Sequence, residues 1–130
     1  PPPAAVAVRQ LAMTFAERYG SFSSEGNYVN VADLTPIVTE RYRRELEAFV
    51  ARERAKKLSS TFSSTRTQVI RADVELVGDT ATRGTVKVMT QRTSQGSGPG
   101  TTYAQVLDLE VLKTSGGWLV DRAVWEPARS

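Results

Sequence analysis

The stretch TTYAQVLDLEVLKTSGGWLVDRAVW, residues 101–125, decides the expected fold. Apolar and polar residues alternate from Thr102 to Lys113, a Ser-Gly-Gly turn follows at 115–117, and a second run continues from Trp118 to Trp125. Alternation with a period of two is typical of β-strands, and a short glycine turn between two such runs indicates an antiparallel hairpin. Two more strands are predicted upstream, at 67–77 and 80–93, with a Gly/Ser-rich hairpin loop at 95–101.

The alternation also predicts which side chains share a face of the sheet. One face of the strand at 67–77 is expected to carry Ile70, Ala72, Val74 and Leu76. Asp108 and Glu110 share a face, either as paired carboxylates for acid–base chemistry or as the solvated side of the sheet. Trp118 and Trp125 are seven positions apart, an odd number, so they are expected on opposite faces.

The N-terminal half has helical spacing instead. A helix is expected over 4–22, with the apolar stripe Val8, Leu11, Ala12, Phe15, Tyr19 and Phe22. Asn30 can cap a short helical turn. Thr35 and Pro36 are read as an N-cap and the first helical position of a long helix that runs to about Lys57. Helices followed by a run of strands indicate a segregated α+β fold.

This order resembles the NTF2-like (cystatin-like) superfamily of cone-shaped domains, over nearly the whole chain from Val8 to Trp125. The strand at 103–113, the Gly-Gly turn and the segment Trp118-Leu119-Val120-Asp121 with Trp125 carry the resemblance. It implies N-terminal helices packed on a curved antiparallel sheet. Because this fold hosts enzymes, binders and scaffolds, it does not by itself imply a function.

The chain opens with three prolines, a composition typical of a stiff linker. We expect 1–3 to be the remnant of a linker behind a membrane helix, 4–127 to be the NTF2-like domain and 128–130 to be a tail. The alternative is an arbitrary boundary in a soluble protein. The expected layout is similar to that of VirB8-like components of type IV secretion (conjugation) machines and of Mce-associated membrane proteins. The sequence lacks the Asn-Pro-x-Gly motif of many VirB8 proteins.

The composition excludes several chemistries. The chain has no His and no Cys, which removes Ser-His-Asp triads, thiol nucleophiles, zinc fingers and disulfides. We therefore expect no catalytic residue, no metal and no cofactor. The net charge is +3, and acids are interspersed with the basic residues of the second long helix. This pattern does not favour nucleic-acid binding.

Two sets of residues are candidates for function. If the cone encloses a pocket, its expected lining is Phe15, Tyr19, Tyr42, Leu46, Val106, Trp118 and Trp125. The alternative interpretation, without a binding function, is that the tyrosines are core residues. The expected interaction surface on the basic helix is Arg41, Arg44, Arg52, Lys56 and Lys57. The alternative interpretation of this basic surface is a solvated helix face without a partner.

The sequence favours a non-enzymatic domain on the extracytoplasmic side of a bacterial cytoplasmic membrane, tethered by an N-terminal helix. It would act as a scaffold or assembly module that contacts other membrane or secretion-complex proteins and itself, through the open sheet face and the charged helix. The alternative is a small-molecule-binding protein, or a cofactor-free isomerase or dehydratase, with a pocket between helices and sheet.

Overall fold

The computed structural model of the chain describes residues 3–23, 26, 28–56, 63–76, 81–96 and 98–128. Its helices are α1 (Pro3–Tyr19), α2 (Val29–Ala32), the 3-10 turn η1 (Thr35–Ile37) and α3 (Glu40–Ala55). Its strands are β1 (Phe22–Ser23), β2 (Ser64–Leu76), β3 (Arg83–Gln95), β4 (Thr101–Thr114) and β5 (Gly117–Trp125). The α+β class is therefore confirmed.

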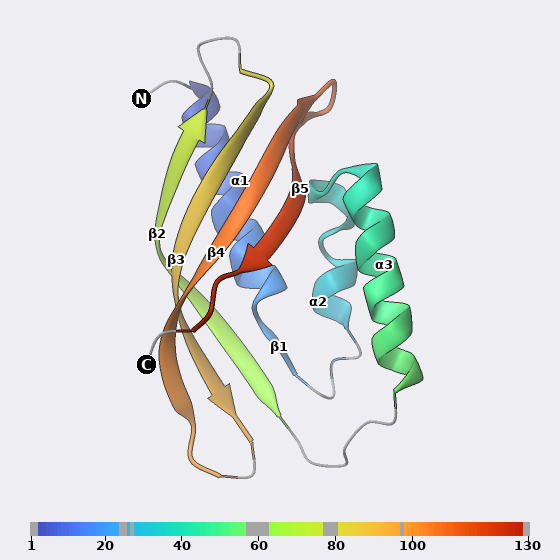
Figure 1. Cartoon of the computed structure of the whole chain (residues 1–130), viewed down its shortest axis with the longest axis vertical. Coiled ribbons are helices and arrows are strands. Elements are labelled where there is room, and N and C mark those ends of the chain that lie inside the picture. The colour runs from blue at the N-terminus through green and yellow to red at the C-terminus, as the bar shows by residue number, and fades with distance from the viewer. Residues whose placement is uncertain are drawn as a thin grey trace.

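The strands form one antiparallel sheet in the order β1-β2-β3-β4-β5. The sheet is strongly curled, and α1 lies along its inner side while α2 and α3 lie beyond the β5 edge (Figure 1). This half-barrel with N-terminal helices is the NTF2-like arrangement that the resemblance implied. The short strand β1 was not predicted.

The core lies between α1 and the inner face of the sheet. Its fully buried members include Val8, Ala12 and Phe15 from α1, and Val88 and Leu107 from the central strands. The helical stripe and the strand alternation thus meet face to face, as amphipathic elements must in order to bury their apolar sides. Phe22 is an exception: α1 ends at Tyr19, and Phe22 is exposed in β1, opposite Thr65.

A bulge in β2 overturns the predicted face of Ile70. Val69 pairs with Thr90 and Arg71 pairs with Met89, so Ile70 has no partner in the ladder and its side chain is 63% exposed. The extra residue reverses the alternation, which places Val69 and Ala72 both toward the core. A period-two pattern cannot reveal this, because a bulge shifts the parity of every residue beyond it.

A second irregularity, in β5, overturns the prediction for the two tryptophans. Glu110 pairs with Arg122 and Val111 pairs with Val120, which leaves Asp121 outside the ladder. The parity therefore changes between Trp118 and Trp125, and both rings pack against the core. The prediction of opposite faces was wrong for the same physical reason as the prediction for Ile70.

The helix α3 begins later than predicted. Thr35 and Pro36 form η1, Val38 is extended, and Thr39 is the N-cap, accepting a hydrogen bond from the Tyr42 backbone N–H at 3.2 Å. Val38 makes a parallel bridge to Val120, and the Thr39 N–H donates to the Val120 carbonyl at 2.9 Å. The segment before the helix is thus used to pair with the edge of the sheet, which delays the helix.

Candidate functional site

The structure brings four of the predicted pocket residues into one aromatic cluster. The Phe15 ring lies 5.0 Å from that of Tyr19 and 6.2 Å from that of Tyr42, and Tyr19 is stacked on Trp125 at 6.3 Å with 9° between the planes. The residues come from α1, α3 and the end of β5, so three elements meet here. Stacked and tilted ring pairs at these distances stabilise the packing beyond the area they bury.

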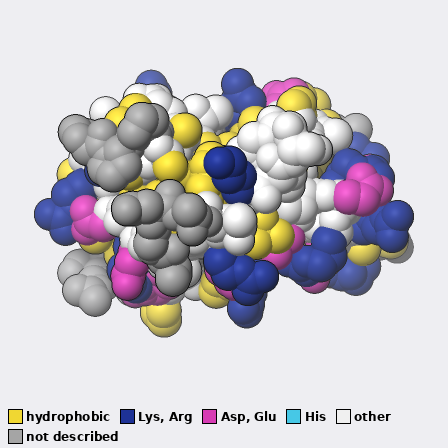
Figure 2. Space-filling view, turned by 90° about the horizontal axis from the view of Figure 1, so that it is seen from above, with side chains coloured by type: hydrophobic (Ala, Val, Ile, Leu, Met, Phe, Trp, Pro, Cys, Tyr) yellow, Lys and Arg dark blue, Asp and Glu magenta, His cyan; other side chains and the backbone are white. Residues whose placement is uncertain are grey.

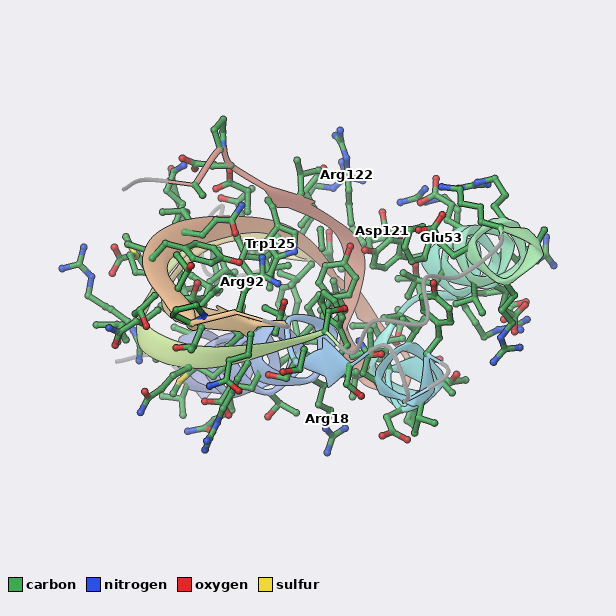
Figure 3. All side chains as sticks on the ribbon, turned by 90° about the horizontal axis from the view of Figure 1, so that it is seen from below. Arg18, Glu53, Arg92, Asp121, Arg122 and Trp125 are labelled. Carbon is green, nitrogen blue, oxygen red and sulfur yellow. The ribbon has the colours of Figure 1, made fainter. Side chains whose placement is uncertain are left out.

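Arg92 of β3 lies at the edge of this cluster, and sequence analysis did not identify it. Its side chain is only 7% exposed, and its guanidinium lies 4.0 Å from the centre of the Trp125 ring. Figure 3 shows Arg92 and Trp125 next to each other inside the curl of the sheet. A cation over an indole face is attracted by the electron density of the ring. A signal was present, because Arg92 falls on the inward parity of β3 with Val86 and Val88.

Neutral groups accept three hydrogen bonds from the Arg92 guanidinium. Nε donates to Thr67 Oγ1 at 3.0 Å, Nη1 donates to Gln105 Oε1 at 2.7 Å, and Nη2 donates to the Gly20 carbonyl at 3.2 Å. Among the residues that the structure describes, no carboxylate forms an ion pair with it. Arg92 is thus a buried cation held by dipoles and aromatic faces, and it joins the residue that follows α1 to β2, β3 and β4.

Burial also determines the protonation of the cluster. Desolvation raises the pKa of Tyr19, and it raises the pKa of Tyr42, which donates a hydrogen bond to Tyr19. Desolvation lowers the pKa of Arg92, since water no longer stabilises the charged form. Both phenols therefore stay protonated at neutral pH. The cluster offers hydrogen-bond donors and a positive charge, and neither phenol can act there as a base.

The other predicted pocket residues lie apart from this cluster. Leu46 is buried one turn after Tyr42 in α3. Val106 is half-buried, and its carbonyl accepts a hydrogen bond from the Glu126 N–H at 2.8 Å, just beyond β5. Trp118 packs against the core at the opposite end of β5 from Trp125 and pairs with Lys113.

The predicted basic surface on α3 carries its own counter-ions. Arg41 pairs with Glu45 at 3.1 Å, Arg44 pairs with Glu40 at 3.3 Å, and Lys56 pairs with Glu53. Acidic side chains lie among the Lys and Arg side chains on the right of Figure 2, where α3 lies. Arg52 is exposed and has no hydrogen-bond or ion-pair partner within the described ranges. Lys57 lies outside the described residues.

Asp121, the residue outside the β5 ladder, links the start of α3 to the sheet through hydrogen bonds and an ion pair. Its Oδ1 accepts a hydrogen bond from Thr39 Oγ1 at 2.6 Å and from Arg41 Nε at 3.2 Å, and Oδ2 lies 3.1 Å from Arg41 Nη2. In Figure 3 the Asp121 label lies on the side of β5 that faces α3. Burial alone would raise the pKa of Asp121, but these hydrogen bonds and the Arg41 charge outweigh burial and lower it.

A groove of about 650 Å³ crosses the outer face of the sheet, opposite α1. Its charged lining consists of Asp73, Glu75, Asp108, Glu110, Lys87 and Arg122. Cross-strand ion pairs join Lys87 to Asp108 at 3.0 Å and Arg122 to Glu110 at 3.2 Å. Val124 is 46% exposed and supplies apolar surface. Asp108 and Glu110 thus lie on an exposed face, as the solvated interpretation of this pair expects, and each has a basic partner.

A smaller cavity of about 280 Å³ shares part of this groove. Glu75, Thr85 and Glu110 line both cavities, and Asp121 lines the smaller one. None of the residues that line the two cavities belongs to the aromatic cluster or is Arg92. The described parts of the chain hold no group of three or more His, Cys, Asp and Glu residues that could bind a metal ion. None of the helices described is long and apolar enough to cross a membrane.

Comparison with known proteins gives structural relatives but no sequence relatives. No protein-family model matches the chain, and a search of curated proteins found no match. Among solved structures, the chain is similar to CagV, a VirB8 homolog of the type IV secretion system (T4SS) from Helicobacter pylori strain 26695, with a TM-score of 0.68 and 7% identity. The match covers 95% of this chain and 99% of that one.

The chain is also similar to the intermembrane space region of the chloroplast protein ARC6. The TM-score is 0.63 and the identity is 12%, and the match covers 96% of this chain and 98% of that one. Identities this low establish a shared fold and no more. They confirm that the helices and the curled sheet are arranged as in the VirB8-like, NTF2-like domains that the resemblance indicated.

Proposed function

We propose that this chain is a non-enzymatic scaffold or assembly domain of a bacterial membrane complex, of the type IV secretion or conjugation kind. The observation that carries the proposal is the end-to-end match to CagV, which covers 95% of one chain and 99% of the other. The match to the intermembrane space region of ARC6 adds a second domain that lies between membranes. In this proposal the domain lies on the extracytoplasmic side and is tethered by a helix N-terminal to it.

The site chemistry agrees with binding rather than catalysis. Asp121 is engaged with Thr39 and Arg41, and the tyrosines of the aromatic cluster remain protonated. A general base needs a pKa near the working pH and access to a substrate proton. The charged surface of α3 and the outer face of the sheet are the surfaces we assign to protein partners, which include other complex proteins and further copies of this chain.

In-cell photo-crosslinking tests this proposal. A photoreactive amino acid is placed in the full-length protein at Arg44, on the exposed side of α3, and at Gly98, which has open space around it, as the control. We expect Arg44 to cross-link to a small, reproducible set of envelope proteins in the membrane fraction, and Gly98 to give none. A protein that fractionates with the cytosol, with no cross-link from Arg44, would overturn the proposal.

A second candidate function is the binding of an anionic small molecule in the cone. The observation that favours it is Arg92, a buried cation among Tyr19, Tyr103 and Trp125. Benzoate and cholate are suitable probes, because each combines a carboxylate with an apolar body. This function predicts that either probe raises the melting temperature of the wild-type domain but not that of Arg92→Met. No shift with either probe would remove this candidate.

A further inference from the structure

The outer groove is anionic on a chain that is cationic overall. Four carboxylates and two cations line it, so its formal charge is −2, whereas the whole chain carries +3. Asp73, Asp108 and Glu110 each have a basic partner within 3.2 Å. Glu75 is exposed, lines both cavities, and has no ion-pair partner among the residues described. The groove therefore suits a positively charged group with an apolar part beside it.

Such a group is present on α3 of the same chain. Phe49 and Arg52 are spaced i and i+3 and so lie along one face of α3, and Lys56, the C-cap residue just beyond the helix, continues this row at i+7. Phe49 is 38% exposed, although its ring contacts that of Tyr28 edge-on at 6.2 Å. Arg52 has no partner among the described residues, whereas Lys56 reaches Glu53. We call Phe49, Arg52 and Lys56 the α3 ridge.

One molecule cannot bring its own ridge to its own groove. Figure 3 shows Arg122 of the groove pointing away from the helices, and α3 lies beyond the β5 edge rather than over the outer face of the sheet. The fold thus presents two complementary surfaces in different directions. The two surfaces can therefore meet only between copies, and such a contact is heterologous, because a different patch is used on each partner.

We propose that the α3 ridge of one copy docks in the outer groove of the next, with Arg52 against Glu75 and Phe49 against Val124. This inference deepens the assembly role proposed above by naming one partner, a second copy, and the two surfaces that meet. Single exposed ion pairs contribute little, so the contact is weak in free solution. Tethering on a membrane would raise the local concentration of the domains and favour the contact.

Charge reversal of Arg52 and of Glu75, which lack ion-pair partners among the described residues, provides the test. Arg52→Glu disables the ridge and keeps the groove, and Glu75→Arg disables the groove and keeps the ridge. Sedimentation velocity of the wild-type domain over a wide concentration range should show oligomers that grow with concentration. Each variant alone should stay monomeric over the same range. A mixture of the two should form oligomers in which the variants alternate, because one contact joins the unchanged Arg52 to the unchanged Glu75 and the other joins the two reversed charges.

The double variant that carries both reversals should associate again, since the charges are exchanged across the same contact. Glu17→Arg on α1 and Arg66→Glu on β2 are the matched controls, because both residues are exposed and lie outside the ridge and the groove. Both should associate like the wild type. All variants should keep the urea unfolding midpoint of the wild type, which excludes loss of fold as the cause.

Several results would overturn the inference. These are a wild-type domain that stays monomeric at all concentrations, single variants that still associate, or a mixture of the two variants that does not associate. The outcome is separate from that of the assembly role. A monomeric domain with intact Arg44 cross-links to envelope proteins would remove only the self-contact, and self-association without those cross-links would remove only the membrane-complex role.

Discussion

Arg92 illustrates how a single residue holds distant parts of this fold together. Burying a guanidinium costs several kcal/mol unless hydrogen bonds and nearby electron density compensate for the lost water. Its acceptors belong to Gly20, Thr67 and Gln105, which lie far apart in the sequence, and its charge lies over Trp125. The segment that follows α1 is thereby attached to β2, β3 and β4.

Gly20 is required at this junction because the backbone approaches β2 too closely for a side chain. A Cβ atom on Gly20 would lie 2.4 Å from Thr67 Oγ1 and 2.9 Å from the Ala16 carbonyl. We expect Gly20→Ala to lower the free energy of unfolding by about 1–3 kcal/mol, as overpacked sites do. Urea denaturation measures this loss. Gly98→Ala, with open space around it, is the control and should stay within about 0.5 kcal/mol of the wild type.

Asp121 should make the stability of the domain depend on acid pH. Its folded pKa lies below the ordinary value of 3.8, so its contribution is complete above that value and is lost as the pH falls through the folded pKa. We expect Asp121→Asn to cost about 1 kcal/mol at pH 7, a modest value because Arg41 is half exposed. The gap between wild type and variant in urea unfolding should narrow below about pH 4. A gap that stays constant down to pH 2.5 would contradict this account.

At the scale of elements, the start of α3 is determined by pairing with β5 rather than by the local helix signal. Thr35 and Pro36 have the residue types of a helix start, yet Thr39 occupies the N-cap and donates from its hydroxyl to Asp121. We expect Thr39→Ala to cost about 1–2 kcal/mol of unfolding free energy, because both interactions are lost. Thr35→Ala should cost less than about 0.5 kcal/mol. Equal losses for the two variants in urea unfolding would contradict the assigned cap.

The bulge in β2 supplies a second test at this scale. A regular strand places Ile70 and Ala72 on the same face, whereas the structure exposes Ile70 and buries Ala72 in the core. We expect Ile70→Thr to change the free energy of unfolding by less than about 0.5 kcal/mol. Ala72→Thr should lower it by about 1–3 kcal/mol through overpacking. Thermal or urea unfolding of both variants tests the bulge. A bulged strand predicts a loss for Ala72→Thr alone, whereas a regular strand predicts a loss for both variants.

At the scale of the whole molecule, stability should be unevenly distributed. The central strands β3 and β4 carry Val86, Val88, Leu107 and Leu109, all fully buried. The buried residues of α3, Tyr42 and Leu46, lie in its first half, and its last turns are mostly exposed. Hydrogen exchange should therefore be at least about a hundredfold slower in the centres of β3 and β4 than in the last turn of α3. Equal protection would show that α3 is held by contacts beyond those described.

The sequence by itself determined the α+β class, the four long strands, the apolar stripe of α1 and the absence of His and Cys chemistry. These features depend on local periodicity and residue type, which a chain carries wherever it folds. The aromatic residues Phe15, Tyr19 and Tyr42 could be named from their stripes, although their meeting with Trp125 could not.

Only the tertiary structure decided that Trp118 and Trp125 lie on the same face of the sheet. It also decided the exposure of Ile70, the late start of α3 and the burial of Arg92. Each of these depends on pairing between segments far apart in the chain: Val120 with Val38, Thr67 with Gly20, or a ladder that leaves out one residue. Local propensity cannot contain that information, because the competing interaction comes from elsewhere in the chain and outweighs the fraction of a kcal/mol by which one residue favours a local conformation.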